Sequence, residues 1–203
     1  MRVLVTGAAG FIGTRLADAL LARDDLEGAS PPRERVHYAR AWRFKAPRLR
    51  RAFERFSRAP ARVRSRLEEY VAANEAWLPE WALFAAIKES QGNVAWTDWE
   101  PGLRARRKPA LAEARRALDA EVRYQQFLQY QFDRQWTALQ ETCRAHGVGL
   151  IGDIPIFVAH DSADVWAARE LFKLDADGRP AVVAGVPPDY FSKTGQLWGN
   201  PLY

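Results

Sequence analysis

The sequence predicts an α/β protein whose strands and helices are unevenly distributed along the chain. Three observations support this: a strand, a glycine turn and a helix open the chain, helical patterns fill its middle, and short apolar runs with strand character follow the last helix. With 203 residues, 48% of them hydrophobic and 27% charged, the chain is long enough and apolar enough to build a core. Disorder over its whole length is therefore not expected.

The opening unit is a predicted strand over residues 2–6 followed by a predicted helix over residues 11–23. Gly7, Gly10 and Gly13 lie between the strand and the first helical turn, which is the context of a dinucleotide-binding turn. Gly7 would allow the tight turn, Gly10 a close approach of backbone N–H groups to a pyrophosphate, and Gly13 close packing of helix on strand.

Residues 1–25 resemble the first βα unit of the extended short-chain dehydrogenase/reductases, such as the nucleotide-sugar epimerases, and the resemblance implies a Rossmann-like unit that binds NAD. The second strand, with its ribose-binding acid, does not follow, because residues 26–34 form a Pro-rich linker. No Tyr has a Lys four residues later, so the catalytic pair of that family is absent. We expect no NAD binding, and an NAD-binding epimerase or reductase fragment remains an alternative.

Helical patterns extend from residue 36 to residue 146. Pro79 suits a first helical turn, and Gly147 suits the stop after a last one. Residues 92–108, which contain Trp96 and Trp99, are predicted to be a loop. The predicted helices cover residues 36–57, 62–77, 79–91 and 109–146.

Basic residues are concentrated at the start of this helical region. Residues 33–66 hold thirteen Lys and Arg against two acids, Glu34 and Glu54, although the whole chain carries only +5. An Arg-rich surface that binds nucleic acid is one interpretation. Apolar residues recur through the stretch, however, which favours solvated helices packed on a core, and we expect no nucleic-acid partner.

Cysteine and histidine usage excludes several kinds of site. Cys143 is the only cysteine, so neither an intrachain disulfide nor a Cys-based zinc site can form. The three histidines show no metal-ligand spacing. No apolar run approaches the 18 residues of a membrane span, and the first residues are not typical of a signal peptide. We expect a cytoplasmic protein without metal or membrane partner.

The last quarter of the chain carries the candidate binding residues. A predicted strand from Val148 ends at Asp153, and Asp161 with Ser162 would cap a short helix. Residues 175–180 are a predicted turn and residues 181–186 a predicted strand. A long loop without periodicity follows, in which aromatic rings lie among carboxylate and amide groups. This combination suits a carbohydrate, whose faces stack on rings and whose hydroxyls bind polar groups; the residues are Asp189, Tyr190, Phe191, Gln196, Trp198 and Asn200.

Four segments, LIGDIPIFVAHDSADVWA, LFKLDADGRPAVVAGVPPDYFSKTGQLWGNPLY, PEWALFAAIKE and FDRQW, resemble the 4-α-glucanotransferases, or amylomaltases, of glycoside hydrolase family 77. The resemblance covers residues 35–203. It implies an incomplete (β/α)₈ barrel with helical insertions, no cofactor, and retaining transfer of α-1,4-glucan segments to an acceptor sugar.

The resemblance also implies site residues. Asp153 matches the carboxylate that contacts the sugar at the cleavage point. Tyr190 and Phe191 match the aromatic tip of a glucan-guiding loop. Gln196, Trp198 and, more weakly, Asn200 match the inner side of that loop. The family's nucleophile and acid/base lie in motifs beyond Tyr203, so we expect a truncated or chimeric chain that is inactive alone; a non-catalytic α-glucan-binding remnant is the second alternative.

Overall fold

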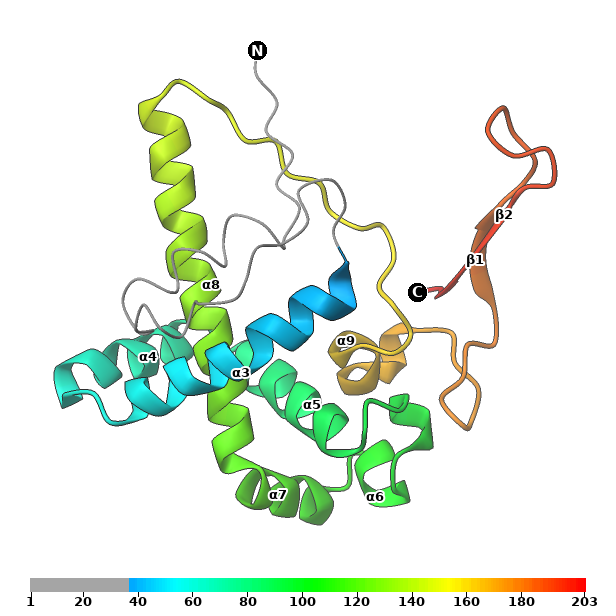
Figure 1. Cartoon of the computed structure of the whole chain (residues 1–203). Coiled ribbons are helices and arrows are strands. Elements are labelled where there is room, and N and C mark those ends of the chain that lie inside the picture. Colours follow the sequence, from blue (N-terminus) through cyan, green and yellow to red (C-terminus); the bar gives the residue numbers. More distant parts are fainter. Residues whose placement is uncertain (1–36) are drawn as a thin grey trace. The chain divides into compact units, whose positions relative to one another are not determined.

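The computed structural model describes residues 37–203 (Figure 1). Gly7, Gly10, Gly13 and the linker at 26–34 lie outside the described residues, as does the predicted Rossmann-like unit. The described residues divide into two compact units. Unit 1 holds residues 37–75 and 124–152, and unit 2 holds residues 76–123 and 153–203.

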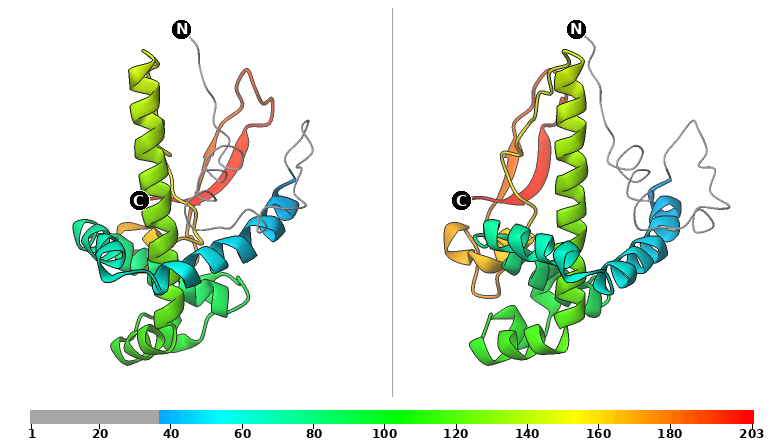
Figure 2. Two further views of the ribbon diagram at one scale, coloured as in Figure 1. Left: turned by 60° about the vertical axis from the view of Figure 1, so that its left-hand side comes forward. Right: turned by 90° about the vertical axis from the view of Figure 1, so that its left-hand side faces the viewer.

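Unit 1 is a packing of helices around aromatic side chains. Helices α3 (Tyr38–Ser57) and α4 (Ala61–Ala73) pack with the part of α8 (Asp119–Ala145) that begins at Tyr124, as both views of Figure 2 show. The predictions of helices over 36–57 and 62–77 are confirmed, although the second helix ends earlier. The shared core contains Ala52, Phe56, Leu67, Tyr124, Phe127 and Tyr130.

Arginines of the basic stretch also take part in this packing. The guanidinium of Arg50 lies 3.6 Å from the ring centroid of Tyr124, and that of Arg48 lies 3.5 Å from the ring of Phe44. Long basic side chains can cover aromatic surface in this way while their charged ends remain near water. The stretch is therefore built as packed helices, as its recurring apolar residues predicted.

The helical pattern over residues 109–146 is two helices, not one. Helix α7 (Lys108–Ala117) and helix α8 are separated at Leu118, whose backbone leaves helical geometry at φ −111° and ψ 22°. Leu118 packs against the buried cluster of unit 2, so tertiary packing overrides the local pattern. The predicted stop at Gly147 is confirmed: its φ is 68°, and Val148 N–H donates to Cys143 O at 2.9 Å.

Unit 2 is built around three tryptophans. Trp96 and Trp166 are fully buried and Trp99 is 2% exposed, and the rings of Trp99 and Trp166 lie 5.5 Å apart. They pack with helix α5 (Leu78–Ser90), which begins with Pro79 in its first turn as predicted. The predicted loop at 92–108 is confirmed in part, because two short elements interrupt it: the 3-10 helix η2 (Trp96–Asp98) and helix α6 (Pro101–Arg104).

Short elements follow the predicted capping residues. Helix α9 (Ala163–Ala167) begins after Ser162, whose Oγ accepts the N–H of Val165 at 3.3 Å, so the capping prediction is confirmed for Ser162. It is wrong for Asp161, whose carboxylate binds Lys88 and the backbone N–H of Trp96 instead. The 3-10 helix η3 (Arg169–Leu171) comes next.

The sheet of the described residues is one antiparallel hairpin. Strand β1 (Val183–Val186) confirms the strand predicted there, and it pairs with β2 (Gln196–Pro201) in the register Gly185 with Leu197. The prediction that the region after residue 186 is loop throughout is wrong over β2. The Gly- and Pro-rich composition of this region does not predict a strand, because β2 is stabilised by pairing with β1 rather than by its own β-propensity.

The predicted strand ending at Asp153 is not formed. Residues 149–155 have no regular secondary structure, and no backbone hydrogen bond pairs them with another segment between residues 37 and 203. A parallel strand needs a neighbouring strand for its backbone groups, and no described segment supplies one. The described residues therefore show helices and a small sheet, which is compatible with the expected incomplete (β/α)₈ barrel fragment with helical insertions. Within the same range, no helix has an apolar stretch long enough to cross a bilayer.

Gly178 provides a test of the tryptophan packing. It has φ +82°, and a Cβ added there would lie 2.5 Å from Cη2 of buried Trp96. We expect Gly178→Ala to lower the free energy of unfolding by about 2–4 kcal/mol, because the methyl group must displace the indole and the left-handed backbone adds strain. Urea unfolding followed by tryptophan fluorescence measures this loss.

Gly92 is the matched control, since its φ is +70° but nothing lies within 4 Å of an added Cβ. Gly92→Ala should cost only about 1–2 kcal/mol, the backbone contribution alone. Equal losses for the two variants would contradict the packing argument.

Candidate functional site

Three of the predicted binding residues, Gln196, Trp198 and Asn200, lie on strand β2 and are called the hairpin row below. The pairing of β1 with β2 shifts register between Val183 and Gly185, and Gly199 has φ +80°, so the regular alternation of side chains is interrupted within this strand. The Trp198 indole Nε1–H donates to Gln196 Oε1 at 3.2 Å. The structure thus places these three residues on one strand and joins the side chains of Trp198 and Gln196, in a region that sequence spacing alone left as part of a loop.

The hairpin row is tied to the segment that precedes α9. Asn200 Nδ2 donates to Val158 O at 2.9 Å, and the rings of Trp198 and Phe157 meet edge-on with centroids 6.0 Å apart. The ring of Tyr203 stacks on that of Phe157, with the two centroids 6.0 Å apart, and the Tyr203 hydroxyl donates to Ile156 O. Trp198 is nevertheless 44% exposed. The contacts fix its position and leave part of the indole open to solvent.

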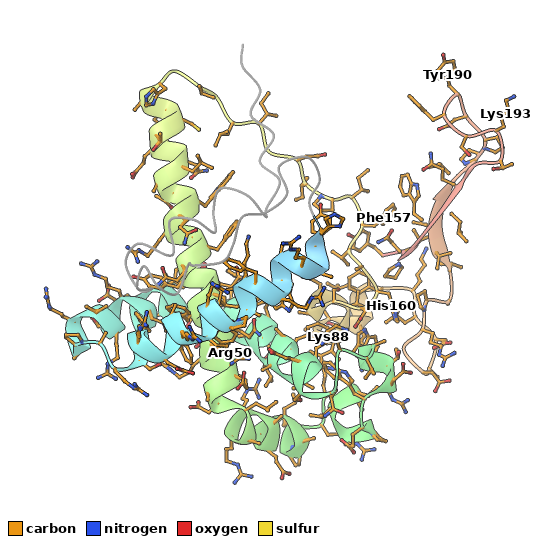
Figure 3. All side chains as sticks on the ribbon, viewed as in Figure 1. Arg50, Lys88, Phe157, His160, Tyr190 and Lys193 are labelled. Atoms are coloured by element: carbon orange, nitrogen blue, oxygen red, sulfur yellow. The ribbon has the colours of Figure 1, made fainter. Side chains whose placement is uncertain are left out.

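Tyr190 lies at the end of the hairpin loop (Figure 3), and Phe191 follows it in the sequence. They are 96% and 87% exposed, and their rings meet at 89° with centroids 5.6 Å apart. Two large aromatic side chains with so little cover contribute almost nothing to a core, and such exposure marks an interaction site when the rings cluster.

The loop end is held by Asp189. Its Oδ1 accepts the backbone N–H groups of Phe191 at 2.9 Å and of Ser192 at 2.8 Å. Ser192 Oγ donates to Gly195 O at 2.7 Å, which closes the same turn. The sequence interpretation placed Asp189 among the sugar-binding groups; in the structure this carboxylate oxygen serves the turn that presents the two rings.

Asp153 is not brought to this row. It is exposed, and its Oδ1 accepts the N–H of Ile154 at 2.8 Å. No hydrogen bond joins it to the other five predicted residues in the described part of the chain. Its expected position at the end of a strand is wrong, because that strand is not formed. The role predicted for Asp153 thus stays a prediction.

Sequence reasoning missed the residues that anchor the hairpin. Trp96 Nε1 donates to His160 O at 2.8 Å, and His160 Nε2 donates to Gly178 O at 2.7 Å. Lys88 pairs with Asp161 in the same region; Figure 3 labels Lys88, His160 and Phe157. These bonds connect residues 157–160, which contact β2 through Phe157 and Val158, to the turn that precedes β1. Only the short polar run His160–Ser162 signals them in the sequence.

A metal centre is not among the candidates. Residues 37–203 contain no group of three or more His, Cys, Asp or Glu side chains that could hold a metal ion. Cys143 is buried in helix α8. The described hairpin offers aromatic rings for stacking and polar side chains for hydrogen bonding.

Asn200 tests whether the row depends on its anchor. Replacing Asn200 by Ala removes the bond to Val158 O, worth about 1 kcal/mol, so we expect amides of β1 and β2 to exchange with solvent about fivefold faster. Hydrogen–deuterium exchange of peptides from residues 183–201 measures this. Lys193→Ala, at the loop end, is the control and should leave the strand amides unchanged; a similar acceleration in both variants would show that Asn200 is no anchor.

Comparison with known proteins identifies the family. Residues 8–203 match the family model described as 4-alpha-glucanotransferase. A 4-alpha-glucanotransferase of Thermus thermophilus is 48% identical over 179 residues, which cover 88% of this chain and 36% of that protein. A second, from Aquifex aeolicus, is 42% identical over 166 residues, 82% of this chain and 33% of its own length.

A solved structure agrees with this result. The amylomaltase from Streptococcus agalactiae in complex with acarbose superimposes with a TM-score of 0.84 at 38% identity, over 91% of this chain and 37% of that one. The present chain thus spans about a third of the length of the relatives it matches. Because the family model covers nearly all of its residues, the chain belongs to the 4-alpha-glucanotransferase family.

Proposed function

We propose that the predicted binding residues of the hairpin, together with Asp153, bind and orient an α-1,4-glucan. They would do so within an enzyme that transfers glucan segments to an acceptor sugar with retention of configuration. The observation that carries the proposal is the anchored hairpin with its open aromatic rings, Tyr190, Phe191 and Trp198. The amylomaltase of Streptococcus agalactiae was solved with acarbose, which supports a saccharide-like ligand for the family's fold.

The hydrogen bonds that the three residues of the row already make determine which of their polar groups can still bind a sugar. Trp198 uses its only donor on Gln196 Oε1, so its contribution is the ring face. Gln196 keeps its NH₂ group as a donor, and Asn200, whose Nδ2 serves Val158, keeps its carbonyl oxygen as an acceptor. Gln196 and Asn200 stand two residues before and two residues after Trp198 in the strand, so a donor, an acceptor and a ring face are available to the edge and face of a glucose unit.

At the loop end, the two rings are positioned to hold a more distant part of a long glucan. The turn around Asp189 fixes their backbone, so little conformational freedom is lost when a ligand stacks on them. Asp153 would contact the sugar at the cleavage point, as the resemblance implies. Its Oδ1 accepts the N–H of Ile154, and the other carboxylate oxygen would accept a sugar hydroxyl.

Retaining transfer needs a nucleophilic carboxylate and an acid/base carboxylate about 5–5.5 Å apart. The resemblance places both in motifs that follow Tyr203 in the family. We therefore assign binding and orientation of glucan to the described residues and leave bond cleavage to those motifs. A cytoplasmic location stays a prediction, and no observation on residues 37–203 favours NAD or nucleic acid as a partner.

Trp198 tests glucan binding. We expect Trp198→Ala to weaken binding of maltoheptaose about tenfold, since one lost ring stack of about 1.4 kcal/mol is a factor of ten. Titration calorimetry on the whole chain measures the affinity. Trp77→Ala is a matched control, because Trp77 is 43% exposed, against 44% for Trp198, but lies outside the hairpin.

Equal weakening in both variants, or no glucan affinity in the unchanged chain, would contradict the proposed binding role. A separate experiment with maltotriose tests whether bond cleavage depends on the motifs that follow Tyr203 in the family. Formation of maltose and longer glucans by the purified chain would show that it performs the transfer itself.

A further inference from the structure

A second cluster of functional groups lies in unit 2 and contains no residue of the hairpin row. It comprises three arginines: Arg104 ends α6, Arg106 follows it, and Arg169 opens η3. The guanidinium of Arg106 lies 4.2 Å from the ring centroid of Trp166, and that of Arg169 lies 4.3 Å from the ring of Trp96. Both rings are fully buried, so they hold the two planar cations in fixed orientations.

The donors of these arginines exceed the acceptors around them. Arg106 Nη2 binds Glu80 at 2.5 Å, but the same carboxylate also binds Arg115 at 2.6 Å. Arg106 Nη1, Arg169 Nε and Arg169 Nη2 are shielded from solvent and have no hydrogen-bond partner. Arg104 donates only to a carbonyl, Thr97 O, at 3.2 Å. Among residues 37–203, no carboxylate lies within 4.0 Å of Arg104 or Arg169.

Arg104 and Arg169 have no carboxylate partner among the described residues to compensate their charge. Burial lowers the pKa of the Arg169 guanidinium, and the positive charges of Arg106 and Arg104 lower it further. A buried donor without an acceptor costs about 1–3 kcal/mol. Water could accept the hydrogen bonds but would leave the repulsion between the guanidiniums. An anion removes both costs at once, because it supplies acceptor oxygens and negative charge together.

We propose that Arg104, Arg106 and Arg169 form a binding site for a phosphate group, either free or carried by a sugar. The three orphaned donors match a group that presents several acceptor oxygens, and planar guanidinium forks bind phosphate in bidentate fashion. The site uses no residue of the hairpin row, so it is separate from the glucan-binding residues. Its occupation would stabilise η2, α9 and η3, because the guanidiniums rest on their tryptophans.

The test is thermal unfolding of the full chain in rising phosphate, with chloride adjusted to hold the ionic strength constant. Tryptophan fluorescence reports directly on the indoles beneath the arginines. We expect a saturable rise in Tm, and we expect Arg169→Met to weaken the apparent affinity at least about tenfold by removing two of the three orphaned donors. Arg107→Met is the matched control, since Arg107 is exposed and adjacent in sequence, and it should respond like the unchanged chain.

Inorganic phosphate and glucose 1-phosphate are titrated separately. Tighter binding of glucose 1-phosphate identifies a sugar ester as the ligand, and tighter binding of inorganic phosphate identifies the free anion. The site is overturned if phosphate raises Tm no more than chloride does, or if Arg169→Met responds as strongly as the unchanged chain.

Arg169→Lys covers the case in which the methionine variant fails to fold. It keeps the positive charge but loses the planar fork, so phosphate should bind several-fold more weakly than to the unchanged chain. Unaltered affinity in the lysine variant would show that Arg169 does not bind the phosphate.

Discussion

The packing of Trp96 is the interaction on which the described part of unit 2 depends. The indole Nε1–H donates to His160 O, the backbone N–H of Trp96 donates to the Asp161 carboxylate, and the ring edge fills the space above Gly178. These contacts join residues that are far apart in sequence, from η2 to the turn before β1. A side chain with this many partners must be buried in one orientation, and the absence of a Cβ at residue 178 is what permits it. The hairpin is therefore held in position by its contacts with the core, because two paired strands alone would be only marginally stable.

The difference between core and binding aromatics is one of exposure rather than of residue type. The high tryptophan content of the sequence is compatible both with a large core and with sugar binding. The structure assigns Trp96, Trp99 and Trp166 to the core and leaves Trp198 half open on a strand. Composition cannot make this distinction, because burial is decided by which partners the fold brings to each ring. The region after residue 186 shows the same limit: its residues point to sugar binding, but only pairing with β1 makes a strand of the part that holds Gln196, Trp198 and Asn200.

Sequence periodicity was most informative where local signals and tertiary packing agree. Helices α3 and α5, the stop at Gly147 and the Ser162 cap all follow from patterns within a few residues of one another. It failed where partners distant in sequence decide. Leu118 breaks a continuous helical pattern by turning into the core, and the apolar run ending at Asp153 forms no strand because no described strand lies beside it. Asp161 looked like a helix cap and is an ion-pair partner of Lys88, which no local pattern could reveal.

Arginine illustrates how one composition supports different physical roles. In unit 1, Arg48 and Arg50 cover aromatic rings of packed helices, and the excess positive charge is spread over a solvated surface. In unit 2, Arg106 and Arg169 also lie over rings, but their remaining donors are shielded from solvent and lack acceptors. Solvent can hydrate the first set of guanidiniums, whereas it does not reach the three orphaned donors of the second. For this reason the proposed anion belongs to the smaller cluster around Trp96 and Trp166 rather than to the dense arginine stretch of α3 and α4.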